Sequence, residues 1–516
     1  MKNKIALLVL LLLGVMAYGQ EIHVTYKIGE KYSDRYKYSN LQSISDDGNG
    51  GTILIRSYYS GMILKPKGYY IEHYNKNLEL ISDFNYKMKG SELVNSFVKN
   101  GQIHLLLLNY NRGANAYEYI IHKSPVTNYN FIQKTILSIE SEEVEKALDK
   151  NFYNRNFSSG FTTTALFNKD KSAFLISTHY KKRKINKHTI YLFNAELENI
   201  IEHDFSSHVE NKNYAFEDIV TSKDLNEVYI IGKAYFKKKR FVTTERKFQY
   251  ELIKITSEEE KITSFDSPGK YSEALKPILD NGKLICVGFY ADRKDNRYNG
   301  ISYFEIDLVT LEMKSKKYNA FSQQFMLDKF GKDRAKQIKN LVFKNIDVTD
   351  NKDILFNAEE YFVTSSYQSN GTGSRIKVRR YHYNDMVSVK LNESGDMAWA
   401  RNINKTEVTQ GDGAYASYSS LTKGDDTYFF ISTAGERPQQ LSNKRIIFRQ
   451  GYSRNRNVFV IKLNSQGDLS YKKMIDDKDA RLPLMVSIPF KNNKENSVLF
   501  YAKRGSKKQL IKVNIK

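Results

Sequence analysis

Residues 51–84 read GTILIRSYY, a short basic linker (SGMILKPK) and GYYIEHYNKNLELISDF. The two outer runs are rich in β-branched and aromatic residues, and polar or basic residues separate and interrupt them. Runs of this composition, bounded by Gly, Asn and Lys, are typical of short strands joined by turns. The stretch therefore predicts an antiparallel meander.

The same pattern occurs eight times along the chain, this copy included, at intervals of roughly 45–70 residues. Intervals of this length are typical of propeller blades and other repeat arrays. The clearest further copies are SAFLISTHY with HTIYLFNAELENIIEHDF, EVYIIGKAYF with QYELIKIT, KLICVGFYA with ISYFEIDLVTLEMKSKKY, and TYFFISTAGE with NVFVIKLNSQGDLSYKKM. We predict an all-β fold, a single β-propeller of eight four-stranded blades. Seven blades are the alternative, if the faint second copy is overcounted.

Strand-like runs place the blades along the chain. Their expected ranges are 38–87, 92–138, 161–206, 214–265, 273–320, 339–404, 415–476 and, for the last blade, 485–516. The last range has only three strand-like runs (MVSIPF, SVLFYAK and QLIKVNI), whereas EIHVTYKI at residues 21–28 alternates and has no other partner. We expect this N-terminal strand to join the C-terminal blade and close the ring, because closure removes exposed strand edges. Short helical inserts are expected near residues 138–157 and 321–339.

The N-terminus has the form of an export signal. Lys2 and Lys4 precede an apolar run, Ile5 to Val15, and Ala17-Tyr18-Gly19 is a small-x-small cleavage site. The run is too short to span a bilayer. We predict a signal peptide at residues 1–19, a propeller domain at 20–516 and no transmembrane segment. The protein is expected to be exported to the periplasm, the cell surface or the medium.

The composition suits a large β-rich core with a basic surface. The chain of 516 residues has 41% hydrophobic and 13% aromatic residues, 7 Pro and a formal net charge of +22. A positive field attracts anionic partners, although an AT-rich genome also encodes many Lys, Asn, Ile, Tyr and Phe residues. The partner that we expect is an anionic polysaccharide or a cell-envelope protein, and nucleic acid is not expected. The single cysteine, Cys286, excludes intrachain disulfides and is expected to be buried.

No catalytic template is present. The sequence has no G-x-S-x-G elbow, phosphate-binding glycine loop, H-E-x-x-H or paired C-x-x-C, and the nine histidines are scattered. No metal or cofactor is therefore expected, and Asp46–Gly51 is better explained as a glycine-rich turn than as a calcium loop. Propellers also host glycosidases and lyases with acids on several blades. The carboxylates next to strand runs are Asp218, Asp307, Glu359 and Asp385.

Basic clusters recur between the second and third strands of several blades. In a propeller these turns emerge on one face, so the pattern predicts a basic rim around one mouth of the channel. Hairpin turns of soluble β proteins carry charge in any case, but these turns have few acidic residues, and arginines favour recognition of carboxylate or phosphate. The anion-binding residues that we predict are Lys182, Arg183, Lys238, Arg240, Arg293, Arg379, Arg380, Arg454 and Arg456. Lys503, Arg504, Lys507 and Lys508 repeat the pattern near the C-terminus.

Residues 339–433 carry a set of short motifs. They are AEEY (358–361), YNDM (383–386), GDMAWARNI (395–403) and YASYSS (415–420). The segment resembles a family of exported, propeller-like bacterial proteins of unknown function, with Glu360 in place of the usual Gln and a weaker basic segment after Ile403. The resemblance covers about a quarter of the chain. It implies a propeller and export, and it implies no activity or catalytic residue.

These observations predict a non-enzymatic binding or scaffold protein of the bacterial cell envelope, with no catalytic residue and with a basic loop face for an anionic partner. The chain is therefore expected to be more of a binder than an enzyme. The alternative is a carbohydrate-active hydrolase or lyase that works at the mouth of the propeller channel.

Overall fold

The computed structural model describes residues 22–61, 65–88, 91–140, 161–182, 185–210, 212–236, 247–292, 297–332, 338–369, 375–411, 413–442, 445–449, 457–480 and 482–516. These residues fall into two compact units. Unit 1 comprises Met1–Lys37, Tyr361–Val387 and Arg401–Lys516, and unit 2 comprises Tyr38–Glu360 and Ser388–Ala400.

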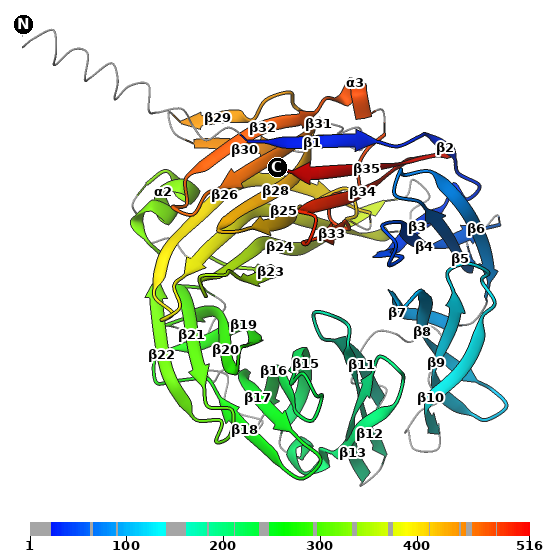
Figure 1. The fold of residues 1–516 in the computed structure, drawn as a ribbon. Helices are drawn as coiled ribbons and strands as arrows, with labels where there is room; N and C mark the ends of the chain where they lie inside the picture. The colour runs from blue at the N-terminus through cyan, green and yellow to red at the C-terminus, as the bar shows by residue number, and fades with distance from the viewer. Residues whose placement is uncertain are drawn as a thin grey trace, which may run out of the picture. The chain divides into compact units, whose positions relative to one another are not determined.

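Unit 2 contains five antiparallel sheets whose four strands pair in sequence order (Figure 1). The first two sheets are β3 (Ser39–Asp46), β4 (Thr52–Ser60), β5 (Lys65–Tyr74) and β6 (Leu80–Lys87), then β7 (Ser91–Lys99), β8 (Gln102–Asn111), β9 (Ala116–Pro125) and β10 (Ile132–Glu140). The third is β11 (Phe161–Phe167), β12 (Ala173–Lys182), β13 (Ile185–Asn194) and β14 (Asn199–Asp204). The fourth and fifth are β15 (Lys212–Thr221), β16 (Val228–Phe236), β17 (Phe248–Ile255) and β18 (Glu260–Ser264), then β19 (Tyr271–Asp280), β20 (Lys283–Ala291), β21 (Gly300–Ile306) and β22 (Met313–Ala320).

The sixth sheet is larger than its predecessors. It has the strand order β23-β24-β25-β26-β30-β29. Its strands are β23 (Leu341–Val348), β24 (Ile354–Ser369), β25 (Arg375–Leu391), β26 (Met397–Thr409), β29 (Gln439–Ser442) and β30 (Arg445–Arg449). Three of these strands are 13 to 17 residues long, and residues 361–387 and 401–409 within them belong to unit 1.

Unit 1 contains two further sheets. One has the order β27-β28-β31-β32, with β27 (Ser419–Lys423), β28 (Asp426–Thr433), β31 (Asn457–Leu463) and β32 (Leu469–Ile475). The other has the order β1-β35-β34-β33, and β2 also pairs with β35. Its strands are β1 (Val24–Ile28), β2 (Tyr32–Ser33), β33 (Phe490–Asn492), β34 (Ser497–Arg504) and β35 (Lys507–Ile515).

This all-β arrangement of successive, mostly antiparallel sheets is the one expected of propeller blades. Each sheet falls within a few residues of its predicted range except the sixth, which also takes in β29 and β30 from the range predicted for the seventh blade. The faint second copy is a complete four-stranded sheet, β7–β10. The N-terminal strand pairs with the C-terminal one as predicted, with Val24 opposite Ile515 and Ile28 opposite Ile511. One strand is misplaced: the run MVSIPF was expected to form a strand, but the strand is Phe490–Asn492 and Val486 is buried in the core instead.

Adjacent sheets of unit 2 pack face to face, which explains the continuous hydrophobic runs of their middle strands. Val228 and Ile230 of β16 belong to a core cluster shared with the β11–β14 sheet. Tyr229 and Ile231, which alternate with them, belong to a cluster shared with the β19–β22 sheet. Because successive side chains of a strand point to opposite faces, a strand between two sheets buries every residue. The neighbouring cysteine, Cys286 of β20, is fully buried in the second cluster as expected.

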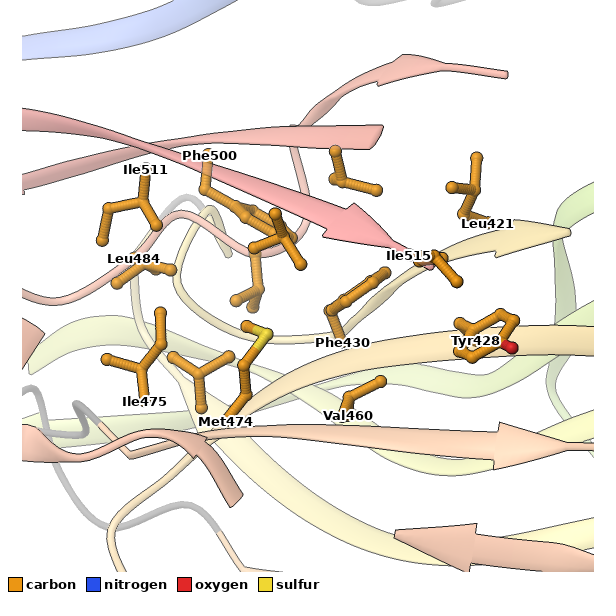
Figure 2. Packing of buried hydrophobic residues seen from close by; sticks show 14 of the residues in the cluster. Leu421, Tyr428, Phe430, Val460, Met474, Ile475, Leu484, Phe500, Ile511 and Ile515 are labelled. Atoms are coloured by element: carbon orange, nitrogen blue, oxygen red, sulfur yellow. The ribbon is translucent and has the colours of Figure 1, made fainter. Parts of the chain in front are cut away.

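The core of unit 1 joins its two sheets (Figure 2). Phe430 of β28 and Val460 of β31 contact the same cluster as Phe500 of β34 and Ile511 of β35. All four side chains are fully buried, and the rings of Phe430 and Phe500 lie 5.6 Å apart in a T-shaped arrangement. Burial of one such side chain contributes about 1.5–3 kcal/mol.

The described residues contain few helices, and all of them are short. The helix α2 (Gln323–Phe330) lies within the predicted insert at 321–339. It begins where the Ser322 side chain accepts a hydrogen bond from the Phe325 amide, and it ends at Gly331 in the left-handed conformation, two ordinary helix caps. The other elements are α3 (Asp477–Ala480) and a 3₁₀ turn, η3 (Ser206–Val209). The predicted insert at 138–157 lies outside the described residues beyond Glu140, where β10 ends. Among the described residues, no helix is long and apolar enough to cross a membrane.

Candidate functional site

The first strands of four consecutive sheets of unit 2 enclose a cavity of about 570 Å³, which we call the inner-strand cavity. It is lined by residues of β15, β19 and β23 and by the end of β11 with the turn that follows it. Apolar walls are formed by Phe167, Ile219, Ile278, Phe343 and Ile346. The polar lining residues are Lys169, Asp218, Lys276, Asp280, Lys344 and Asn345. Cavities of this size, mostly apolar with a few polar groups, are typical of small-molecule sites.

β-bulges bring polar residues to this cavity. The pairing register shifts by one residue at Glu217 in β15, at Glu273 in β19 and at Lys344 in β23. A bulge changes which side chains of a strand face inward and often lies beside an active site. Lys344 at one bulge and Asp218 directly after another both line the cavity.

Glycines of the neighbouring second strands make room for two of these bulges. A Cβ atom on Gly232 would lie 2.7 Å from the carbonyl oxygen of Ala215, and one on Gly288 would lie 1.6 Å from that of Ala274. No other residue leaves space for the bulged backbone. The glycines in VYIIGKAYF and KLICVGFYA are therefore the sequence signal that could have located the bulges.

Two lysine–aspartate pairs tie the walls together. Lys276 of β19 donates to Asp218 of β15 at 2.7 Å, and both side chains are about one third exposed. Lys169, from the turn after β11, donates to the Ile346 carbonyl at 2.8 Å and to Asp347 at 3.0 Å, both on β23. A carboxylate beside an ammonium group in an accessible cavity can move a proton or stabilise a developing charge.

Of the four carboxylates singled out in the sequence, two belong to this region. Asp218 lines the cavity, and Glu359 is buried and lies 3.7 Å from Lys344. Asp307 instead closes a turn by accepting the amide hydrogens of Val309 and Thr310. The Lys314 side chain and these two amides hold the pKa of Asp307 well below its usual range.

Asp385, the fourth carboxylate, lies in unit 1 and accepts the amide of Lys405 and the Asn402 side chain. Asp307 and Asp385 therefore stabilise local structure. Asp347 has no motif around it, and only the structure brings it to Lys169.

The structure describes three of the nine predicted anion-binding residues. Lys182 ends β12, and nothing is described of its side chain. Arg379 and Arg380 lie within β25 and not in a turn, because the alternating runs continue and lengthen the hairpin of β24 and β25. Arg379 is exposed, and Arg380 donates to Ser366 at 3.3 Å. Outside the described residues lie Arg183, Lys238, Arg240, Arg293, Arg454 and Arg456.

Two basic clusters that are far apart in the sequence meet in one sheet of unit 1. The hairpin of β29 and β30 comes from the connection between β28 and β31, yet β30 pairs in parallel with β26. The pairing places Lys405 opposite Phe448 and Thr406 opposite Arg449. We call the unit 1 parts of β24, β25 and β26, together with β30 and β29, the hairpin sheet. Arg379, Arg445 and Arg449 all belong to it.

Of the four basic residues near the C-terminus, two do not fit the predicted basic turn. Arg504 and Lys507 are exposed on either side of the β34–β35 turn, whereas Lys503 and Lys508 are buried. Lys503 donates to the Asp34 carboxylate and to the Tyr36 carbonyl, the latter at 3.1 Å. This lysine thus fastens the N-terminal segment to β34.

Histidines and the acidic turn have structural partners. His122 contacts the Tyr86 hydroxyl at 2.5 Å and His188 contacts Ser177 at 2.7 Å. Asp47 accepts the amides of Asn49 and Gly51 and contacts His73, so the loop at 46–51 is held by its own carboxylate. Within the described part of the chain, no group of three His, Cys, Asp or Glu side chains is placed to hold a metal ion.

Comparison with known proteins finds likeness in structure only. No protein family and no curated protein matches the sequence. The β-propeller domain of the Trilobed protease from Pyrococcus furiosus is 11% identical, with 86% of this chain and 98% of that chain covered and a TM-score of 0.35. The polysaccharide lyase Uly1 is 11% identical, with 92% and 90% covered and a TM-score of 0.37. Prolyl oligopeptidase B from Galerina marginata is 10% identical, with 91% of this chain but only 56% of that chain covered and a TM-score of 0.40.

These comparisons correct one expectation. The sequence predicts a non-enzymatic binding or scaffold protein, more of a binder than an enzyme, and this prediction is wrong. The propeller proteins that the chain resembles are peptidases and a polysaccharide lyase. The alternative, a carbohydrate-active hydrolase or lyase, agrees better with them. At such identities and TM-scores the likeness identifies neither a reaction nor a residue of this chain, so any site must be argued from the chain itself.

Proposed function

We propose that the protein is a carbohydrate-active hydrolase or lyase and that its reaction takes place in the inner-strand cavity of unit 2. The observation that carries the proposal is the Asp218–Lys276 pair, 2.7 Å apart, on the wall of a cavity of about 570 Å³ with apolar sides. Such a cavity suits one or two sugar rings, whose carbon-bound faces contact apolar walls while their hydroxyl groups meet polar side chains.

Asp218 can serve either reaction. In a lyase it would remove the proton from the carbon beside a uronate carboxylate; a C=C bond then forms as the neighbouring C–O bond to the next sugar breaks, and the departing sugar oxygen takes a proton from water. In a hydrolase it would act as one of two carboxylates around the glycosidic bond, with Asp347 on β23 as the candidate for the second. Lys276 and Lys169 would stabilise negative charge in both cases.

An acidic polysaccharide is the substrate class that this cavity favours. Three lysines line it (Lys169, Lys276 and Lys344) against two aspartates (Asp218 and Asp280). The whole chain carries a formal net charge of +22, which attracts a polyanion over a long range. The anion-binding residues predicted outside the described part of the chain would add to this attraction.

The test is degradation of acidic and neutral polysaccharides by the wild-type protein and by Asp218→Asn and Lys276→Met. The wild type should shorten an acidic polymer, and Asp218→Asn should lower the rate by about 100-fold or more, the usual range for a general base. Ultraviolet absorbance of an unsaturated product identifies a lyase, and new reducing ends without it identify a hydrolase. Glu393→Gln is the matched control, since Glu393 forms an exposed 2.7 Å pair with Lys283 away from the cavity. An inactive wild type, or full activity in Asp218→Asn, would contradict the proposal.

We also propose that the eight sheets form one closed eight-bladed ring and that the protein is exported, as the N-terminal signal and the resemblance in residues 339–433 imply. The pairing of β1 with β35 supports closure. Deletion of residues 22–33 should expose the edge of β35 and make the protein aggregate or unfold at lower temperature. An equally stable, monodisperse deletion variant would argue against closure. The exported protein should begin at Gln20.

A further inference from the structure

A second cavity, of about 250 Å³, lies in unit 1 where the chain leaves β28 and forms the β29–β30 hairpin. We call it the hairpin cavity. Arg437 and Pro438 contribute to one side, and Phe448 and Arg449 of β30 contribute to another. No residue of the inner-strand cavity takes part in it.

The floor of the hairpin cavity is held in place by packing. Phe448 is buried, and its ring lies 5.7 Å from the rings of both Phe459 and Tyr471. Its strand is also paired in parallel with β26, at Lys405. The position of Arg449, next along β30, is therefore set by a rigid neighbour.

The charged groups of the hairpin cavity are both positive. Arg437 and Arg449 are exposed, and none of the described residues that line the cavity is acidic. In the described part of the chain, neither guanidinium group has a carboxylate within ion-pair distance, and the nearest acid in the sequence, Glu436, is exposed beside Arg437. A guanidinium group presents two parallel N–H donors that match the two oxygens of a carboxylate.

We propose that the hairpin cavity binds the carboxylate of a single acidic sugar unit. The volume, below that of most drug-sized sites, suits one ring, with the charged group at the two arginines and the ring against Pro438. Recognition of an anion follows from the arginines alone, whereas the identity of the ligand as a carboxylate-bearing sugar rests on the proposed function. The cavity is a place where an acidic polymer is held, separate from the place where it is cleaved.

Ligand-observed NMR of the full chain tests the proposal with glucuronate, with glucose as its neutral counterpart, and with inorganic phosphate. Glucuronate should bind and glucose should not. Arg437→Ala and Arg449→Ala should each weaken the binding by about tenfold, the usual effect of losing one hydrogen-bonded charge partner. Arg35→Ala is the matched control, because Arg35 is an exposed arginine of the same unit that lines neither cavity.

Three results would overturn the proposal: no binding of glucuronate, equal binding of glucose or phosphate, or equal losses in Arg35→Ala and the two cavity variants. A folding defect is excluded if Arg449→Lys, which keeps the charge but not the two-donor geometry, folds normally and still binds more weakly. Measuring both binding and degradation separates this proposal from the proposed function. Asp218→Asn should lose degradation of the polymer but still bind glucuronate in the hairpin cavity. The two arginine variants should lose glucuronate binding there, and this loss does not bear on the reaction proposed in unit 2.

Discussion

The two cavities hold their charges in opposite ways. In the inner-strand cavity of unit 2, Asp218 and Lys276 are paired across two strands and partly exposed. In the hairpin cavity of unit 1, the arginines are exposed, and the paired charges lie in the neighbouring strand β26, where the buried Lys405 and Glu407 side chains are 2.9 Å apart. Charges that face a cavity in pairs are suited to proton transfer, whereas unpaired arginines over a rigid sheet are suited to recognition.

The largest effect is expected where the hairpin sheet is anchored. Glu407 accepts hydrogen bonds from Lys405 and from the Ser417 amide. Glu407→Gln removes a buried counter-charge of this ammonium group, so the free energy of unfolding of unit 1 should fall by about 3–5 kcal/mol. Chemical denaturation followed by circular dichroism measures this change. Glu393→Gln, at an exposed ion pair, is the control. If Glu407→Gln lowers the free energy of unfolding no more than Glu393→Gln does, the buried pair does not anchor the sheet.

Acid should weaken unit 2 more than unit 1. Burial lowers the pKa of three histidines in unit 2, to about 4 for His104 and His122 and well below the usual range for His188, so each stays neutral in the folded state. The unfolded chain binds these protons near pH 6.5, so stability is complete above that pH and falls as the pH drops toward 4. His104 and His122 each contribute about 3 kcal/mol to this loss, by the usual 1.36 kcal/mol per pKa unit.

Denaturation midpoints between pH 7 and pH 4.5 measure this dependence. His122→Asn should remove about one third of the slope that these histidines cause, since one of the three titrating groups is gone. Its hydrogen-bonding partner, the Tyr86 hydroxyl, keeps a polar neighbour in this variant. An unchanged slope would show that other groups cause the acid sensitivity.

The smallest effect on stability is expected at the inner-strand cavity itself. The Asp218–Lys276 pair is one third exposed, and such pairs contribute about 0–1 kcal/mol. Asp218→Asn should therefore melt within a few degrees of the wild type while its reaction rate falls by about 100-fold. A variant that loses both stability and activity would assign Asp218 a structural role and remove the contrast between the two cavities.

Most of the fold could be predicted because its interactions are local. Each run of alternating or continuous hydrophobic residues forms a strand that pairs with the next one along the chain, and the turns between them are short. The N-terminal strand was found by a different argument: the last blade lacked a strand, and EIHVTYKI lacked a partner. The strand predicted at MVSIPF is wrong because Val486 is buried without being in a strand. Hydrophobicity alone does not distinguish a buried strand residue from a buried loop residue.

The candidate sites were much less predictable. Asp218 was one of four carboxylates that could not be ranked, because spatial proximity to Lys276 depends on the bulges of two different strands. Gly232 and Gly288 carried the relevant signal, but a glycine in a strand has several meanings. In the sequence, the basic residues of the sixth sheet and those between β28 and β31 form two separate clusters. Nothing in either segment indicates that β30 would pair with β26.

The sequence by itself determined the repeat, the number and order of most strands, and the strand that joins the two ends of the chain, because side-chain alternation and turn composition act within a few residues. Only the tertiary structure decided which charges are exposed. The same residue type, lysine, is buried beside a carboxylate at position 405 and at position 503, and lines a cavity at position 276. Pairing between distant strands sets that difference, since it determines how much water remains around each ammonium group.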